Sequence, residues 1–209
     1  MRLPDPAAVR AEFMRRGFVL VADALDTAEQ ATLSDAAVAL VERHSASVDR
    51  TEPEKRLWYD VVTGDRIAAE GRPLFAFYTN PEMVAWVRSV TDSPTLAPSP
   101  HLRSSININC LHLAGQRYPW HRDAVPYTSL LFLSSVPPQA GGTFLIRDGE
   151  GTVVKVQPRS GCLVFMDGAR CEHAVSPLTE DALRLSVPMV YPARVLARPP
   201  GLDEYLYGT

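Results

Sequence analysis

Long hydrophobic runs are absent from this sequence. No stretch of about 18 consecutive apolar residues occurs, so no segment is predicted to cross a bilayer as a helix. The first residues, Met1 to Pro6, also lack the apolar core of a secretory signal. We therefore expect a cytoplasmic protein.

Cysteine is scarce, and charge of one sign is not in excess. The three cysteines, Cys110, Cys162 and Cys171, are odd in number and lie in or near strand patterns, so we expect reduced thiols that mostly pack. The net charge is −3 at pH 7 and the arginines are scattered, which provides no basic field for nucleic acid or an anionic membrane. A small molecule is the partner that these features leave open, and the oligomeric state is not predicted.

Repeats, low-complexity tracts and interdomain linkers are absent too. A chain of 209 residues, 46% of them hydrophobic, can bury a sizeable core, and we expect one domain over residues 1–209. Residues 1–100 are expected to supply helical support and a lid region, and residues 101–192 the strands of the core. Residues 193–209 are expected to form a tail that leaves the barrel at Arg198-Pro199-Pro200-Gly201 and covers part of it.

Helix signals are concentrated in the first hundred residues. Asp5-Pro6 predicts a helix start and Gly17 its end, and a strand is expected over Gly17–Ala22. The capping-box pattern at Thr27–Gln30 predicts a long helix that ends near His44, and Asn80-Pro81 predicts another. Residues 45–79 show no clear period.

Short strand patterns separated by turn residues follow from about Arg103 onward. The expected strands are 104–113, 117–123, 127–135, 142–147, 152–157, 162–167, 173–176 and 182–191. Eight short strands after a helical start predict a mainly β protein with N-terminal helices, in which two sheets form a cupin-like jelly roll, or double-stranded β-helix, flanked by α-helices.

His121-Arg122-Asp123 is the first chemically informative motif. Residues i and i+2 of a strand point to the same face, so His121 and Asp123 are expected to aim at one point while Arg122 faces away. Pro126 cannot continue a regular ladder, which places Asp123 near a strand end. An isolated His-x-Asp is most often a pair of polar side chains exposed to solvent, so the residues that follow decide its meaning.

His173 and Arg184 are those residues. Two histidines and one carboxylate are the ligand set of a facial triad for Fe(II), with three positions left open, although a hydrogen-bonded structural histidine is the alternative for His173. Arg184 and Ser186 share one face of a strand whose other face is apolar. A buried guanidinium needs a partner, which is either a carboxylate ligand or an Asp or Glu of the protein itself.

Together these residues resemble the Fe(II)/2-oxoglutarate-dependent oxygenases. That family places its metal in His-x-Asp…His and its co-substrate on an Arg-x-Ser after the second histidine, and here Arg184 follows His173 by eleven residues. Gly141–Phe144 and Pro158…Gly161 resemble the prolyl-hydroxylase and phytanoyl-hydroxylase branches. The segments Asn107–Leu111, Trp120-His121 and Pro126–Thr128 are similar to small bacterial enzymes that act on free amino acids. The resemblance covers roughly residues 104–192.

The resemblance implies Fe(II) at His121, Asp123 and His173, with 2-oxoglutarate and O2 as co-substrates and release of succinate and CO2. Arg184 and Ser186 would hold the far carboxylate of 2-oxoglutarate. Asn109 is a candidate for its chelating end, with a structural strand amide as the alternative. Some of these relatives are halogenases of natural-product biosynthesis, in which Gly or Ala vacates the carboxylate position for chloride. The presence of Asp123 therefore favours hydroxylation or a related oxidation.

The substrate is expected to be a small polar metabolite such as a free amino acid, with a nucleoside, a sugar or a carrier-bound substrate left open. The candidate residues near the iron and on a lid over residues 45–79 are Arg103, Asn107, Trp120, Arg170, Glu172, Trp58 and Tyr59, with Phe75 and Tyr78 as further lid residues. Two other functions remain open. One is a jelly roll that binds a metal and a small ligand without turnover, and the other is a metal isomerase or lyase that needs no O2.

Overall fold

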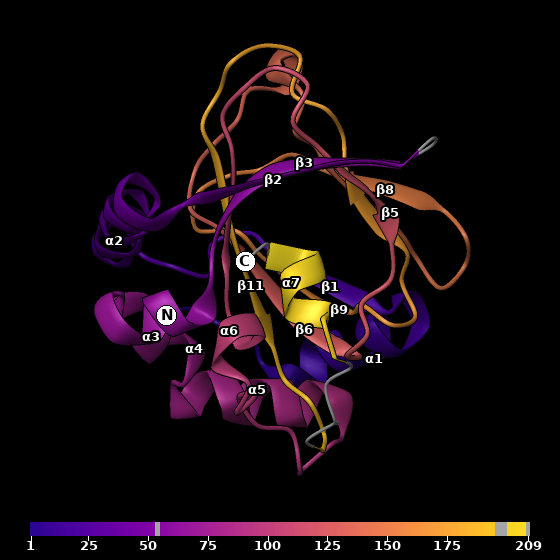
Figure 1. Cartoon of the computed structure of the whole chain (residues 1–209). Helices are drawn as coiled ribbons and strands as arrows, with labels where there is room; N and C mark the ends of the chain where they lie inside the picture. Colours follow the sequence, from indigo (N-terminus) through magenta and orange to yellow (C-terminus); the bar gives the residue numbers. More distant parts are fainter. Residues whose placement is uncertain (53–54, 195–199, 208–209) are drawn as a thin grey trace.

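A computed structural model describes residues 1–52, 55–194 and 200–207. Its strands form two antiparallel sheets, as a jelly roll requires (Figure 1). The larger sheet has the order β1-β9-β6-β11-β4-β3-β2 and consists of β1 (Phe18–Val21), β2 (Ala46–Glu52), β3 (Lys55–Val62), β4 (Ile108–Leu111), β6 (Tyr127–Phe132), β9 (Leu163–Asp167) and β11 (Arg184–Val190). The smaller sheet has the order β5-β10-β7-β8 and consists of β5 (Tyr118–His121), β7 (Phe144–Arg147), β8 (Val153–Val156) and β10 (His173–Val175).

The helices pack mainly against the outer face of the larger sheet. They are α1 (Pro6–Arg16), α2 (Thr27–His44), α3 (Gly64–Glu70), α4 (Arg72–Tyr78), α5 (Pro81–Thr91), α6 (Leu102–Ser105) and α7 (Leu202–Tyr207), with a 3-10 turn at Pro138–Ala140. One core cluster joins Phe13 of α1, Leu40 of α2 and Val87 of α5 to Val187 and Phe165 of the sheet. None of the helices in the described ranges is long and apolar enough to span a membrane.

The predicted helix starts are confirmed by their caps. The Asp5 side chain accepts a hydrogen bond from the Ala7 amide. The long helix does begin near Thr27, but its capping box is formed by Asp26 and Glu29, one residue earlier than the predicted Thr27–Gln30 pattern. Gly17 ends α1 with a left-handed backbone, φ 82°, which glycine adopts without strain. The eight strands predicted after residue 103 are all present, but the first is shorter than expected because residues 102–105 form α6.

The structure differs from the prediction over residues 45–79. Strands β2 and β3 pair along their whole length as a hairpin and extend the larger sheet, and helices α3 and α4 follow. Segment 45–79 is therefore regular structure and not an irregular lid. Phe75 and Tyr78 lie on α4, where Tyr78 is buried in the helix-side core.

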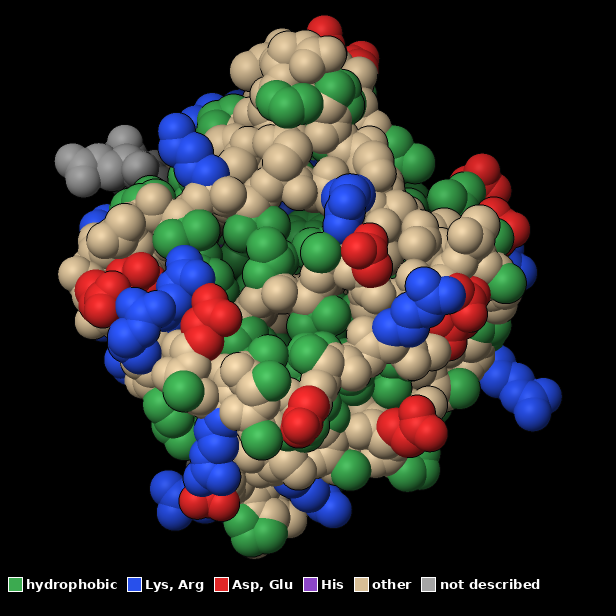
Figure 2. Space-filling model, turned by 180° about the vertical axis from the view of Figure 1, so that it is seen from behind, with side chains coloured by type: hydrophobic (Ala, Val, Ile, Leu, Met, Phe, Trp, Pro, Cys, Tyr) green, Lys and Arg blue, Asp and Glu red, His purple; other side chains and the backbone are tan. Residues whose placement is uncertain are grey.

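The last helix, α7, packs back against the strands, in the region expected to form a C-terminal tail over part of the barrel. Arg198 and Pro199 of the predicted exit lie outside the described residues, whereas α7 contacts the β2–β3 hairpin, and the Tyr59 hydroxyl donates to the Leu206 carbonyl at 3.1 Å. The surface seen from behind carries basic and acidic side chains interspersed with one another (Figure 2). The same face is hollowed near its centre, where hydrophobic side chains are visible.

Strand β11 places two chemically different faces on one element. Leu185, Val187 and Met189 face the helix-side core. The residues that alternate with them line a cavity of about 420 Å³ to which both sheets contribute, namely Arg184, Ser186, Pro188 and Val190. Strand β11 pairs with β6 over residues 186–190 but with β4 only over residues 184–186, and the Pro188 carbonyl accepts one more bond from the Asn107 amide.

Candidate metal centre

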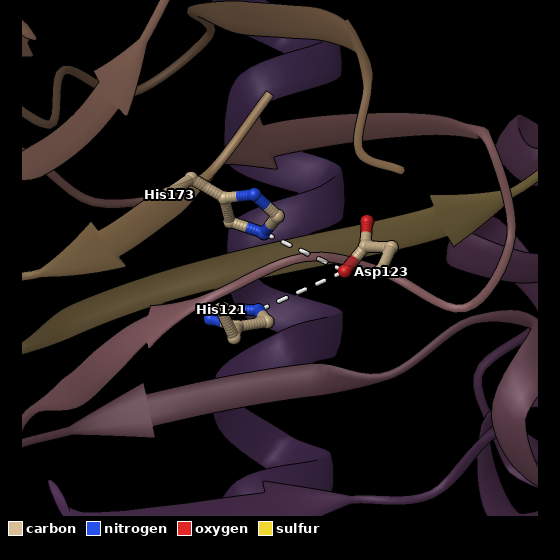
Figure 3. Close-up of side chains that lie close together, drawn as sticks. All are labelled: His121, Asp123 and His173. Carbon is tan, nitrogen blue, oxygen red and sulfur yellow. Dashed lines mark ion pairs between the residues drawn. The ribbon is translucent and has the colours of Figure 1, made fainter. Parts of the chain in front are cut away.

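Two neighbouring strands of the smaller sheet bring the two histidines together. His121 is the last residue of β5 and lies directly opposite His173, the first residue of β10. Their ring centroids are 4.1 Å apart. Asp123 follows β5 by two residues, and its Oδ1 lies 3.7 Å from His121 Nε2 and 3.5 Å from His173 Nε2. Figure 3 shows the three side chains converging on one point.

These three residues are placed as metal ligands. One ligand atom from each lies within 4.8 Å of the others. His121 Nδ1 lies 2.9 Å from the Pro119 carbonyl and His173 Nδ1 lies 3.0 Å from the Cys171 carbonyl. Because a carbonyl oxygen can only accept, each Nδ1 carries a proton, so in the neutral imidazole the lone pair of Nε2 is left facing the site.

Asp123 is held from two sides. The buried Thr128 hydroxyl donates to Oδ2 at 2.7 Å, and the Asp123 amide donates to the Gly168 carbonyl at 2.9 Å. A side-chain carbon added at Gly168 would lie 2.2 Å from Oδ2, so the backbone there packs directly on the carboxylate. The free oxygen, Oδ1, is the one that faces both histidines.

The electrostatics of the three groups are coupled. Burial, with the neighbouring His173, lowers the pKa of His121 to about 4. Burial opposes protonation of His173 as well, but its hydrogen bond to Asp123 outweighs burial and raises the pKa of His173. For Asp123, burial acts to raise the pKa, and the hydrogen bond from His173 reverses this, so its pKa is lowered. The site therefore holds an ionised carboxylate between two imidazoles.

Arg184 lies in the same cavity and is 1% exposed. Its Nε donates to the Gly142 carbonyl at 2.8 Å and its Nη1 to Ser186 Oγ at 3.0 Å. Its Nη2 is buried without a hydrogen-bond partner, and burial lowers the pKa of the guanidinium to about 9. No ion pair joins Arg184 to an acidic residue among the described residues, so the internal salt bridge considered from the sequence is wrong. A carboxylate ligand would satisfy the remaining donor.

The other predicted residues divide by whether they line the cavity. Asn107, Asn109 and Tyr59 do so, and Asn109 lies opposite Ser186 across β4 and β11. Asn107 is already hydrogen-bonded to the Tyr207 hydroxyl at 3.2 Å. The residues absent from the lining are Arg103, Trp120, Arg170, Glu172 and Trp58.

Contacts outside the cavity explain why most of these residues do not line it. Trp120 stacks with Arg147, which also pairs with Glu172 on the far side of the same strands. Arg170 donates to the Met14 and Arg15 carbonyls at the end of α1. Trp58 stacks with Arg56 on the hairpin.

The cavity also contains residues that the sequence prediction missed. Arg122 was expected to face away, but β5 ends at His121, so strand alternation no longer applies and Arg122 lines the cavity. Thr128, Tyr118 and Tyr207 line it as well. For Thr128 a signal existed, since a hydroxyl close after His-x-Asp can turn back to the carboxylate.

Comparison with known proteins agrees with this geometry. A family model described as Halogenase D matches residues 4–147. The chain belongs to the Halogenase D family. The match includes His121 and Asp123 and ends before His173 and Arg184, which the structure adds to the same cavity. In this Halogenase D family member the position two residues after the first histidine is an aspartate. No curated protein matches the sequence.

Solved structures show that the Halogenase D chain has the fold of the Fe(II)/2-oxoglutarate oxygenases. The epimerase SnoN, solved with Fe3+, alpha ketoglutarate and nogalamycin RO, is 23% identical with a TM-score of 0.75, covering 98% of this chain and 92% of SnoN. A 2OG-Fe(II) oxygenase family protein from Burkholderia pseudomallei is 15% identical with a TM-score of 0.73, covering 94% of each chain. A Pseudomonas putida prolyl-4-hydroxylase is 18% identical with a TM-score of 0.64, covering 91% of this chain and 100% of the enzyme.

Proposed function

We propose that this protein is an Fe(II)- and 2-oxoglutarate-dependent dioxygenase that hydroxylates a small molecule. One observation carries the proposal. The three converging ligand atoms share a cavity with a buried guanidinium that has a free donor and no acidic partner among the described residues. A metal that binds a dicarboxylic acid explains both features at once.

The donor set fits Fe(II), which binds two imidazoles and one carboxylate and keeps three positions open. His121, Asp123 and His173 would hold the ion through Nε2, Oδ1 and Nε2. Bound iron supplies, with 2-oxoglutarate and O2, the oxidising chemistry that a C–H bond requires. The protein's own part is to orient the reactants and exclude water.

The residues that would hold 2-oxoglutarate lie on adjacent strands. Arg184 and Ser186 of β11 would bind its far carboxylate, with Arg184 fixed in place by the Gly142 carbonyl. Asn109 of β4, opposite Ser186, would donate to its chelating end. Leu130 and Phe144 line the same cavity and would shield the bound acid from solvent.

Asp123 supports hydroxylation rather than halogenation. A halogenase of the kind that the sequence resembles keeps a small residue here and leaves a coordination position for chloride. In this chain Thr128 and Gly168 hold a carboxylate in that place. The two other functions considered, ligand binding without turnover and an isomerase or lyase reaction without O2, give no reason for a buried free guanidinium beside the metal site.

Binding of 2-oxoglutarate is the first test. Calorimetry on protein loaded with Ni(II), an inert substitute for iron, should show a complex whose affinity falls at least about 10-fold in Arg184→Gln, since a hydrogen bond to a charged group contributes about 1.5–3 kcal/mol. Arg159→Gln, which changes an exposed arginine that pairs with Asp23, is the matched control. Equal affinity in the wild type and Arg184→Gln would show that the anchor is wrongly assigned.

The reaction type needs a second measurement. Iron-loaded protein should form succinate only with O2 and 2-oxoglutarate, and a turned-over substrate should gain oxygen in the presence of chloride, as mass spectrometry will show. In Asp123→Gly this hydroxylation should be lost, and chlorination or loss of metal binding should replace it. A chlorinated product from the wild type would overturn the proposal of hydroxylation.

A further inference from the structure

Arginines outnumber acidic residues among the described residues that line the cavity. Arg122 lines the cavity, is exposed, and forms no ion pair with any described residue. It stands between two metal ligands in the sequence, so its backbone is fixed next to the site. Arg184, the other arginine in the lining, is assigned above to 2-oxoglutarate, which leaves Arg122 available to a second ligand.

Carboxylates for a positively charged substrate are nearly missing. Among the described lining residues, Asp123 is the only Asp or Glu, and it already contacts both histidines and Thr128. Two acidic residues outside the lining have other partners, since Glu172 pairs with Arg147 and Asp60 with His112. A substrate ammonium would lose its hydration without gaining a counter-ion, which is unfavourable.

The cavity wall that β11 forms beyond the metal is apolar, while Ser99, His101 and Ser104 add polar side chains to the cavity lining. Strand β11 continues from Ser186 to Pro188 and Val190, and Val190 pairs with Thr128, the residue that holds Asp123. Four residues of strand span about 13 Å, so this wall reaches well past the 2-oxoglutarate end. Leu206 of α7 and Pro192 also line the cavity. A cavity of about 420 Å³ with such walls suits a ligand with a hydrocarbon body.

We propose that the substrate is a carboxylic acid with an apolar body and no free amine, and that Arg122 binds its carboxylate. This inference rests on the proposed function, because it assigns Arg184 to the co-substrate. It replaces the free amino acid expected from the sequence. Three of the residues expected to grip a zwitterion, Arg103, Arg170 and Glu172, do not line the cavity.

Three probes of one shape separate these chemistries: octanoate, octanamide and octylamine. Their binding is measured by calorimetry on protein loaded with Ni(II) and saturated with 2-oxoglutarate, so that Arg184 is already occupied. Octanoate should bind at least about 10-fold more tightly than octylamine or octanamide, as one well-placed charged contact predicts. The net charge of −3 would by itself favour the amine, so a preference for the acid reports a local group.

Arg122→Gln should weaken octanoate about 10-fold and leave octanamide unchanged. Arg147→Gln, which removes the same charge from an arginine outside the cavity lining, should change neither. Absent or weaker binding of octanoate compared with octylamine, or equal octanoate affinity in the wild type and Arg122→Gln, would overturn the inference. Saturation with 2-oxoglutarate is measured first in each sample, so failure of the proposed function is recognised separately, as a missing co-substrate complex.

Discussion

The ligand-free protein should become more stable when Arg184 is replaced by methionine. Burial lowers the pKa of this guanidinium from its ordinary value to about 9, a difference that corresponds to about 5 kcal/mol against the charged form in the folded state. Because the folded pKa of this base lies below the unfolded one, the full penalty applies below about pH 9 and disappears as the pH rises from there towards the ordinary pKa of arginine. At neutral pH the buried charge of Arg184 therefore destabilises the folded protein by the full penalty.

The gain from Arg184→Met is smaller than that penalty. The substitution removes the hydrogen bonds to the Gly142 carbonyl and Ser186 Oγ and leaves a buried carbonyl unpaired, which together cost about 2–3 kcal/mol. The net gain of about 2 kcal/mol should raise the Tm of the ligand-free variant by about 4–8 °C for a chain of this size. Arg159→Met, at an exposed arginine, should leave the Tm nearly unchanged.

The co-substrate should reverse the order of stability. At a concentration of about 100 times its Kd, 2-oxoglutarate stabilises the metal-loaded wild type by about 2.7 kcal/mol, and Arg184→Met should gain little or nothing. Differential scanning calorimetry with and without 2-oxoglutarate measures both effects. A lower Tm for the ligand-free variant would show that the guanidinium is well paired in the free protein. An undiminished shift with 2-oxoglutarate would show that the acid binds elsewhere.

Three further predictions concern the hold on the metal. Thr128→Val should weaken Co(II) binding about 10-fold, because the Thr128 hydroxyl fixes the Asp123 carboxylate, whereas Thr128→Ser should keep the wild-type affinity. Equal Co(II) affinities of the wild type and Thr128→Val in a spectroscopic titration would contradict this prediction. Gly168→Ala should displace Asp123, since the new carbon would meet Oδ2 at 2.2 Å, and the same titration should show a larger loss than in Thr128→Val. Metal affinity should fall as the pH is lowered, because the raised pKa of His173 lets protons compete with the metal for this ligand. Histidines titrate roughly between pH 5 and pH 8, so a metal affinity that stays constant over this range would refute the reasoning.

Local signals explain what the sequence predicted correctly. Helices α1 and α2 begin at Asp5 and Asp26 because these side chains cap the first turns, an interaction within a few residues. The faces of β11 follow from alternation, which separates Arg184 and Ser186 from Leu185 and Val187 whatever the rest of the chain does. The metal ligands could be predicted from their residue types and from their order in the chain, a His-x-Asp followed by a second histidine.

The missed features depend on contacts between distant segments. The hairpin β2–β3 carries an alternating signal in Leu57, Tyr59 and Val61, all buried, but charged and aromatic neighbours obscure it. The six-residue helix α7 is too short to be predicted alone and is placed by its contacts with the hairpin. Which loops reach the cavity is likewise tertiary information.

One of the candidate substrate residues that do not line the cavity could have been excluded from the sequence. Trp120 precedes the ligand His121 within β5, so alternation already turns it to the opposite face. Arg122 is the reverse case, because the same rule was applied one residue beyond the strand end at His121. Strand alternation is therefore a reliable guide only between the ends of the ladder.

A proline removes one backbone donor from the wall of the cavity. Within a strand the amide and carbonyl of one residue point to the same side, and the Pro188 carbonyl accepts a hydrogen bond from the Asn107 amide of the neighbouring segment. The donor that proline lacks would have pointed the same way, so the reciprocal bond is missing, although Ile106 and Met189 form a bridge in the same register beyond it. Asn107 and Pro188 both line the cavity. This part of the wall is thus held by one hydrogen bond where a regular ladder would have two.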